Sequence, residues 1–457
     1  MALIVPFRGI TYHSRMVPDL PRLVAPPYDV ISPEEQEALH RRHELNVVRL
    51  ILNQETPEDG PGHNRYSRAA GFYRDWLREG VLVRAEEPQF YFLEEEFSPP
   101  PFLAGKEAGR KVRRGFIGLI RLEEFAAGTV LPHEKTQTKP KADRLALMRA
   151  CRANFSQVFS LYADPEGEMA AIFERVSSIR PDCDFTNDSG VRHILRKVGD
   201  REALRRARAV MRPKKIFIAD GHHRYETALA YQKEKRARVP EGAGREPFNF
   251  TMMYFSALED EGLTILATHR VITRLEGFRA SSFLERLGVF FAVESFPFVA
   301  GDELSVRERF LRALSSRGGT EHAMGLFLSG ESRYRLLTLQ DSRAMERADP
   351  ALPPSLRALD VSILHRLIFQ DLLKIGPEEV AGQKNILYFK DPHKALEQVR
   401  SGRGMLAFLL NPTKVSQIRE VALAGGTMPP KSTFFYPKLL SGLVLNPLDE
   451  DEEIDLE

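Results

Sequence analysis

The pattern of apolar and polar positions divides the chain into short elements of two kinds. Apolar residues recur with helical spacing over 33–43, where Ser32 is placed to cap the first turn, and again over 66–79. Short continuous or alternating apolar runs predict strands instead. We expect such strands at 46–52, 89–97, 115–122, 215–219, 250–258 and 264–271.

The same mixture of periods restarts after residue 274. It predicts helices and strands that alternate up to about residue 410. The helices are expected near 283–287, 306–315 and 361–373, and the strands at 323–328, 334–339 and 405–410. The fold class is therefore α/β in the broad sense (mixed α+β). We expect an α/β region over 1–273, an α+β domain over 274–448 and a disordered acidic tail over 449–457.

Composition excludes several classes of protein. The 457 residues are 43% hydrophobic and 28% charged, which is typical of globular domains. Lys and Arg total 65 against 63 for Asp and Glu, so the net charge of +2 gives no global field that would attract nucleic acid or anionic lipid. Two cysteines are too few for a disulfide framework, and no apolar run approaches the ~18–20 residues of a membrane helix. We expect a cytoplasmic protein with no membrane partner.

The sharpest motif is KIFIADGHHRYE at 215–226. A strand ends at Asp220, Gly221 permits a tight turn, and a helix follows at once. The unpaired N–H groups of a helix start favour a bound anion. The candidate phosphate ligands are Gly221, His222, His223 and Arg224, and Asp220 is the candidate ligand for Mg²⁺.

Two other interpretations of this motif stay open. Asp220 can simply cap the helix while the histidines lie at the surface. Zinc is also conceivable, but adjacent histidines rarely bind one zinc ion, and the chain has no HExxH or CxxC spacing. Mg²⁺ held by one carboxylate and a bound phosphate fits the motif better, because that ion keeps most of its waters.

The second motif is VLPHEKTQTKPKADR at 130–144. His133 and Glu134 follow a short strand and are surrounded by lysines. A glutamate among cations stays ionised, and it suits a general base only if desolvation raises its pKa again. A solvated loop with Glu134 paired to a lysine is the structural alternative.

Three further stretches are less specific. APPYDVIS presents Tyr28 and Asp29 on a rigid turn. MPPKSTFFYPKL gathers lysines and aromatic residues in one turn, which suggests base stacking or simply a core segment. RACRANFS supplies the candidate substrate ligands Arg152, Asn154 and Ser156. No P-loop, no GxGxxG after a strand and no GxSxG elbow occurs in the sequence.

Taken together, these stretches resemble the domain-of-unknown-function family 1015 along nearly the whole chain. The resemblance lies in PFRGI, APPYDVIS, NRYSRAA, RRGFIGLIRLEEF, VLPHEKT, RANFSQVFSLY, FIADGHHRYETALAY, THRVI, LDVSILHRLI, FLLNPTKV and KSTFFYPKLLSGLVLNPL. The family name itself implies no activity.

LPHEKT and DGHHR are also similar to the two motifs of the ParB/sulfiredoxin-like superfamily, in its branch of nucleotide-dependent free-serine kinases. That resemblance implies a ParB/sulfiredoxin-like core elaborated by insertions. It implies that Glu134 activates the substrate hydroxyl, with His133 and Asp220 beside it as catalytic residues, and that the turn from Asp220 to Arg224 holds nucleotide phosphates with Mg²⁺. About 75 residues separate Arg144 from Asp220, far more than in the small kinases, so the acceptor pocket is expected to differ.

The leading hypothesis is a phosphotransferase that uses Mg²⁺ and ATP or ADP on a small hydroxylated metabolite such as free serine. The same site, run in reverse, would act as a phosphatase. The alternative from another class is a nucleotide-binding regulatory module of ParB type, although no basic DNA-binding run is evident. The kinase hypothesis requires that 131–145 and 219–227 lie side by side.

Overall fold

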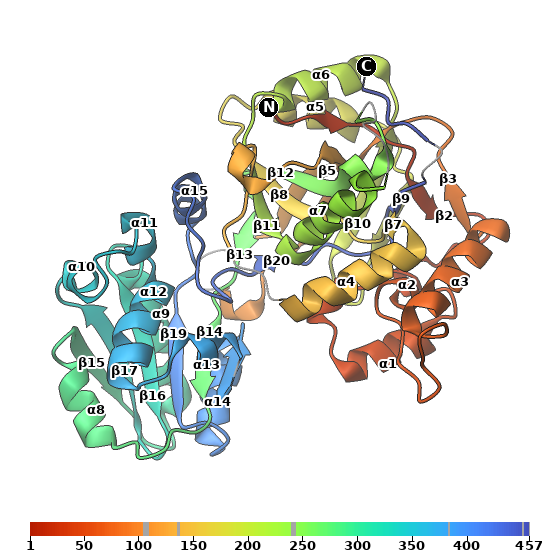
Figure 1. Ribbon diagram of the computed structural model, residues 1–457. Helices are drawn as coiled ribbons and strands as arrows, with labels where there is room; N and C mark the ends of the chain where they lie inside the picture. The colour runs from red at the N-terminus through yellow and green to blue at the C-terminus, as the bar shows by residue number, and fades with distance from the viewer. Residues whose placement is uncertain (104–108, 135–137, 239–243, 383, 450–451, 457) are drawn as a thin grey trace.

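The computed structural model describes residues 1–103, 109–134, 138–238, 244–382, 384–449 and 452–456. These residues form two lobes (Figure 1). The N-terminal lobe is built on a large mixed sheet, and the C-terminal lobe on an antiparallel sheet. This architecture confirms the predicted mixed α/β fold class.

The sheet of the N-terminal lobe contains nine strands within the described residues. Two pairs of neighbours, at 130–131 with 216–217 and at 158–162 with 253–257, are parallel, and the other pairs are antiparallel. The strands predicted at 89–97 and 115–122 are confirmed, and they are antiparallel neighbours. The order is β6 (Val130–Leu131), β11 (Ile216–Asp220), β8 (Val158–Tyr162), β12 (Phe250–Ala257), β5 (Lys111–Arg121), β4 (Phe90–Phe97), β10 (Arg192–Val198) and β9 (Cys183–Thr186), and β1 (Ile4–Val5) also pairs with β5.

Helices cover one face of this sheet, where aromatic side chains such as Phe92, Phe116 and Tyr225 pack into one apolar cluster. The predicted helices at 33–43 and 66–79 are confirmed, and Ser32 and Asn64 cap them. The helices of the lobe are α1 (Pro33–Arg42), α2 (Val48–Ile51), α3 (Arg65–Arg78), α4 (Thr138–Cys151), α5 (Glu168–Ser177), α6 (Arg201–Met211) and α7 (His222–Arg236).

The strand predicted at 46–52 is wrong, because the segment contains the short helix α2. A short apolar run does not distinguish a buried strand from a buried helix. The side chain of Asn46 decides locally: its Oδ1 accepts the N–H of Val48, and its Nδ2 donates to the carbonyl of Val24. These bonds start a turn where the apolar pattern alone predicts extended chain.

The sheet of the C-terminal lobe is antiparallel. Its strand order is β15 (Phe291–Pro297), β17 (Arg333–Leu339), β16 (Ala323–Leu328), β19 (Leu406–Leu410), β14 (His269–Ile272) and β18 (Ile386–Phe389). The helices of this lobe are α8 (Ala280–Leu287), α9 (Glu303–Arg317), α10 (Ala344–Ala348), α11 (Pro354–Arg357), α12 (Asp360–Ile363), the π-helical segment Leu364–Leu372, α13 (Pro377–Ala381), α14 (Pro392–Arg400) and α15 (Val415–Leu423).

The lobe boundary falls earlier than residue 274. The predicted strand at 264–271 is split: β13 (Thr264–Ile265) pairs with β20 (Phe435–Tyr436), whereas β14 joins the C-terminal sheet. The change of sheet occurs in the short connection between β13 and β14.

The chain returns to the N-terminal lobe after α15. β21 (Asn446–Pro447) pairs with β7 (Ala153–Asn154), and Leu445 exchanges backbone hydrogen bonds with Ile10. Leu439, Leu440, Leu443 and Val444 join the apolar cluster on the sheet face opposite α5–α7. The last part of the expected domain 274–448 therefore belongs to the N-terminal lobe, whose sheet it covers.

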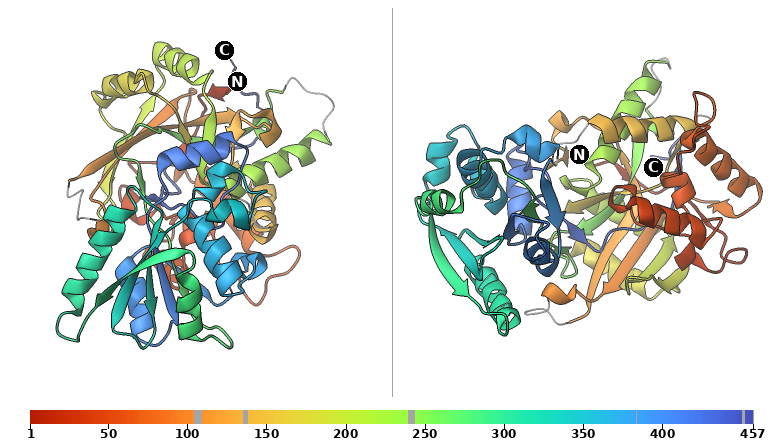
Figure 2. Two further views of the ribbon diagram at one scale, coloured as in Figure 1. Left: turned by 90° about the vertical axis from the view of Figure 1, so that its left-hand side faces the viewer. Right: turned by 90° about the horizontal axis from the view of Figure 1, so that it is seen from below.

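The described part of the acidic tail also contacts this lobe, in contrast to the expected disorder. Both carboxylate oxygens of Glu452 accept from Arg84, and the N–H of Ile454 donates to the carbonyl of Arg245 (2.8 Å). Figures 1 and 2 show the two chain ends next to each other on the N-terminal lobe. No helix within the described ranges is both long enough and apolar enough to cross a membrane.

Candidate functional site

The two motifs meet at one edge of the nine-stranded sheet. β6 and β11 are parallel neighbours, so the segments that follow them leave the sheet at the same edge. The N–H of His133 donates to Nε2 of His222 (3.2 Å), which joins the residues after β6 to the first residue of α7. The expected proximity of 131–145 and 219–227 is confirmed for the described residues.

His133 is buried, and both of its ring nitrogens contact protein atoms. Nδ1 donates to the carbonyl of Ile218 (2.7 Å), so Nε2 accepts from the hydroxyl of Thr433 (3.1 Å). Burial lowers the pKa of His133 to about 4 and also lowers the pKa of His222, so both rings are neutral at pH 7. These contacts favour a positioning role for His133 rather than proton transfer to a ligand.

Gly221 begins α7 with φ +90°, a conformation that favours glycine. A Cβ at this position would lie 2.7 Å from Nε of Arg224, because the guanidinium folds back over the glycine. Arg224 donates to the carbonyl of Gln157 and to Oδ2 of Asp220 (3.0 Å). The arginine is therefore held at the start of α7 by the protein itself, and its side chain is 11% exposed.

Asp220 lies between two cations. Its Oδ2 accepts from Arg224, and its Oδ1 accepts from Nζ of Lys438 (3.0 Å). Burial alone would raise the pKa of Asp220, but Lys438 and Arg224 together hold it well below the usual range. Asp220 is ionised at neutral pH, and its charge is neutralised within the protein.

Sequence reasoning missed the contribution of the turn from Lys431 to Lys438. This turn provides the Thr433 hydroxyl that contacts His133 and the ammonium group that contacts Asp220. The signal was present as the KSTFFYPKL stretch, but its spacing from the other motifs gives no indication that the chain returns to them. The aromatic residues divide: Phe435 is buried against Phe159, whereas Phe434 lies between lysines.

Glu134 contacts the same turn. Its Oε1 accepts from the N–H of Lys431 (3.4 Å), and the N–H of Met428 donates to the carbonyl of His133 (2.6 Å). Burial raises the pKa of Glu134, while the contact with Lys431 acts in the opposite direction. The carboxyl group is half-buried at the same sheet edge as the start of α7. A carboxyl group whose pKa is raised by burial accepts a proton more readily than a solvated one, which is the property that a general base needs.

The other predicted ligands lie deeper or apart. Asn154 accepts from Nδ2 of Asn446 (2.9 Å), and the Ser156 hydroxyl bonds that of Ser441 (2.6 Å), so both tie the RANFS segment to the returning chain. Arg152 is exposed and has a positive φ of 50°. Asn154 and Ser156 line a small cavity of about 50 Å³ together with Arg224.

The APPYDVIS turn reaches that cavity as well. Tyr28 lines it, and the guanidinium of Arg144 lies 3.9 Å from the centre of the Tyr28 ring. Burial and the charge of Asp29 raise the pKa of Tyr28 to about 12, whereas Arg144 and Arg224 act in the opposite direction. The charge of Asp29 also raises the pKa of His223, against the lowering by burial. The turn that carries Asp29 therefore lies near the start of α7.

The donor set at this edge fits phosphate more directly than a metal ion. Within the described ranges, no group of three or more His, Cys, Asp or Glu side chains is arranged to hold a metal. Both oxygens of Asp220 accept from cations, so Mg²⁺ at Asp220 would share this carboxylate with two positively charged side chains. The N–H groups of Arg224 and Tyr225 donate to the carbonyl of Gly221 (2.9 and 3.1 Å), and the positive end of the α7 dipole at this turn favours an anion.

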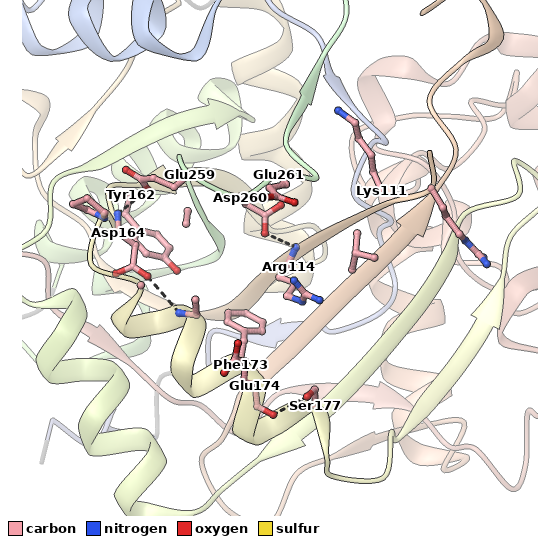
Figure 3. Close-up of a pocket in the computed structure, with 16 residues that line it drawn as sticks. Lys111, Arg114, Tyr162, Asp164, Phe173, Glu174, Ser177, Glu259, Asp260 and Glu261 are labelled. Carbon is pink, nitrogen blue, oxygen red and sulfur yellow. Dashed lines mark hydrogen bonds between the residues drawn. The ribbon is translucent and has the colours of Figure 1, made fainter. Parts of the chain in front are cut away.

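A larger cavity of about 700 Å³ lies elsewhere (Figure 3). It is lined by Tyr162 and Ala257, at the ends of β8 and β12. β8 is antiparallel to β11, and Asp220 pairs with Phe159 near the start of β8, so this cavity opens at the opposite edge of the sheet. Its acidic residues satisfy local backbone groups, as when Asp164 accepts from the N–H of Met169 (3.0 Å).

Comparisons with known proteins add a family. A family model described as "Protein of unknown function (DUF1015)" matches residues 4–362. No curated protein matches the chain.

Among solved structures, the chain is similar to a conserved hypothetical protein from Pyrococcus furiosus, with a TM-score of 0.33 and 11% identity over 70% of this chain and 94% of that chain. Free serine kinase in complex with AMP gives a TM-score of 0.32 and 12% identity over 72% and 89%. SbnI from Staphylococcus aureus gives 0.34 and 10% over 74% and 90%. A likeness of this size does not bear on the chemistry of the site.

Proposed function

We propose that this chain, which belongs to the DUF1015 family of proteins of unknown function, is a nucleotide-dependent phosphotransferase acting on a small hydroxylated metabolite. The main support is one observation: a half-buried carboxyl group with a raised pKa, Glu134, stands at the same sheet edge as the start of α7. A general base and an anion site are the two parts that such a transfer needs.

Phosphoryl transfer requires little covalent help from a protein, because positioning and charge neutralisation do most of the work. In our proposal the nucleotide phosphates bind at the first turn of α7, where the positive end of the helix dipole attracts them. His133 and His222 hold the loop after β6 against this turn through their mutual hydrogen bond. Glu134 then accepts the proton of the acceptor hydroxyl as that oxygen attacks the terminal phosphorus. The bond from this phosphorus to the bridging oxygen breaks, and the nucleotide leaves with one phosphate fewer.

Arg224 and Lys438 keep the region of Asp220 from repelling phosphate. Each forms an ion pair with Asp220 at 3.0 Å, so the aspartate adds no net negative charge to the site. A nucleotide brought as its Mg²⁺ complex would arrive with part of its own charge neutralised. We assign no protein ligand to that ion beyond Asp220, which would then share its carboxylate between Mg²⁺, Arg224 and Lys438.

The test is direct. The purified protein is incubated with Mg²⁺, free serine and ATP, ADP or CTP in turn, and phosphoserine is measured by mass spectrometry. We expect phosphoserine with at least one nucleotide. Phosphoserine is also incubated with the nucleotide that the forward reaction would release, which tests the reverse transfer. Phosphoserine incubated without any nucleotide tests phosphatase activity.

Two outcomes would contradict the proposal in different ways. Nucleotide binding without turnover of any hydroxylated acceptor would identify a nucleotide-binding regulatory module. Absence of nucleotide binding would mean that the start of α7 serves only the fold.

A further inference from the structure

Lys390 brings a cation from the C-terminal lobe to the edge of the site. It follows β18, and its Nζ donates to Oγ1 of Thr268 (2.5 Å). The same Nζ lies 4.4 Å from the centre of the Phe434 ring, and Nζ of Lys438 lies 4.3 Å from it. Two ammonium groups from different lobes therefore share one aromatic ring beside Asp220.

A third basic side chain contacts the same part of the protein. Arg270, on β14, is 1% exposed and donates to the carbonyls of Thr268 and Lys431 (3.0 Å for Lys431). Its Nε is buried without a hydrogen-bond partner. Among the described residues, no carboxylate forms an ion pair with Lys390 or Arg270. Basic side chains thus gather where the lobes meet, and Lys438 has a carboxylate partner, Asp220, whereas Lys390 and Arg270 have none among the described residues.

We propose that Lys390 and Lys438 bind an anionic group, a carboxylate or a phosphate ester, of the molecule whose hydroxyl faces Glu134. The acceptor is then an acid rather than a neutral alcohol or sugar. This assignment deepens the proposed function and depends on it only for the position of the hydroxyl.

The two ammonium groups have donors left for such a ligand. Each ammonium has three N–H bonds, and the described contacts use one on Lys390, to Thr268, and one on Lys438, to Asp220. The face of an aromatic ring attracts a cation but accepts no strong hydrogen bond. An anion beside the ring would therefore satisfy donors that Phe434 leaves free.

The charges that face Lys390 support the same conclusion. Burial and the charges of Arg270, Lys431 and Lys438 together lower the pKa of Lys390 to about 6, while Glu134 acts in the opposite direction. His269 is also close and neutral, because burial lowers its pKa to about 3. A bound anion would restore the charge that these surroundings disfavour.

The experiment measures the affinity of O-phosphoserine by calorimetry for the wild type, Lys390→Gln and Lys394→Gln. Lys394 is a matched control, because it is an exposed lysine four positions further along the same lobe. We expect the wild type and Lys394→Gln to bind equally and Lys390→Gln to bind at least about tenfold more weakly. Of the two anionic groups of O-phosphoserine, serine has only the carboxylate and O-phosphoethanolamine has only the phosphate. The compound that binds Lys390→Gln more weakly than the wild type therefore identifies the group that Lys390 binds.

Equal affinity in all three proteins would overturn the proposal, and so would a wild type that does not bind O-phosphoserine. Should Lys390→Gln fail to fold, the wild type decides through serine, whose charges do not change between pH 6 and 8. If the carboxylate is the group bound, the affinity of serine should rise as the pH falls and Lys390 gains its proton. Lys390 has no role if neither serine nor O-phosphoethanolamine binds more tightly at pH 6 than at pH 8. If O-phosphoserine binding depends on Lys390 but no nucleotide yields phosphoserine, the proposed transferase fails while the acid site stands.

Discussion

At the scale of single residues, the proposed role of Glu134 as proton acceptor gives the most direct test of the proposed function. We expect Glu134→Gln to keep nucleotide affinity nearly unchanged, because glutamine fills the same volume and removes a negative charge that repels phosphate. Loss of the proton acceptor should reduce turnover by about 10²–10⁴-fold. Steady-state kinetics and nucleotide titration measure both, with Glu124→Gln, an exposed glutamate in the same lobe, as control. Matched losses of affinity and rate would show that Glu134 binds nucleotide or its metal instead.

The raised pKa of Glu134 has a consequence for pH. A protonated glutamate cannot accept a proton, so turnover is lost as the pH falls through the pKa of Glu134. Burial raises that pKa above its ordinary value of 4.5, and the contact with Lys431 only partly opposes the shift. The acid limb of kcat should therefore lie above pH 4.5 and be absent from the residual activity of Glu134→Gln. A limb unchanged in the variant would belong to another group.

Arg224 illustrates what residue type does and does not predict. A guanidinium beside a helix start predicts a phosphate ligand, but the structure shows it donating to Gln157 and Asp220. We expect Arg224→Ala to weaken nucleotide binding and also to lower the free energy of unfolding by about 1–3 kcal/mol, because a buried carbonyl and an ionised carboxylate lose a donor. Thermal melts and nucleotide titration separate the two effects. Lys233→Ala, an exposed site on the same helix, should change neither.

At the scale of elements, the turn into α7 depends on a glycine. Gly221→Ala should destabilise the protein by about 1–2 kcal/mol, because φ is +90° there, and should also weaken nucleotide binding by displacing Arg224. Gly128→Ala is the matched control: its φ is +70°, but a Cβ there meets nothing within 4 Å. Both variants should melt early, and only Gly221→Ala should lose affinity. Equal affinities would mean that the position of Arg224 does not matter for the ligand.

Elements with a strong local signal were predictable, and those set by distant partners were not. Ser32 and the helical period of 33–42 determine α1 within one residue. The apolar run at 264–271 instead divides between two sheets, because β13 finds its partner in β20 and β14 finds its partners in β18 and β19. Nothing within the run indicates that division.

At the scale of the whole molecule, two of the three segments that meet at the candidate site carry motifs that were recognisable in the sequence. The LPHEKT and DGHHR motifs were recognisable because each has charged and histidine side chains directly after a predicted strand. The Lys431–Lys438 turn and Lys390 were not assigned, because their role depends on the chain crossing back from one lobe to the other. Contacts over such sequence separations leave no periodic trace.

The returning segment should be required for folding of the N-terminal lobe. A chain ending at Thr427 lacks Leu439, Leu440, Leu443 and Val444, which are each at most 5% exposed in the structure. Removing them uncovers one sheet face, so we expect a truncated protein that aggregates or is cleaved rapidly by protease. A peptide spanning 428–449, supplied in trans, should restore protection. A stable, protease-resistant truncated chain would show that the segment only decorates the fold.

The same crossing bears on how the protein is made. β12 ends at Ala257, but the leucines that cover its sheet are added only after the entire C-terminal lobe has been translated. At about 5–20 residues per second, the nascent N-terminal lobe waits roughly 10 s or longer with that face uncovered. During this interval neither Thr433 nor Lys438 has been synthesised, so Asp220 and His133 lack their partners. We therefore expect the nascent chain to expose an apolar face that chaperones can bind. The candidate site becomes complete only after the C-terminal lobe has been translated.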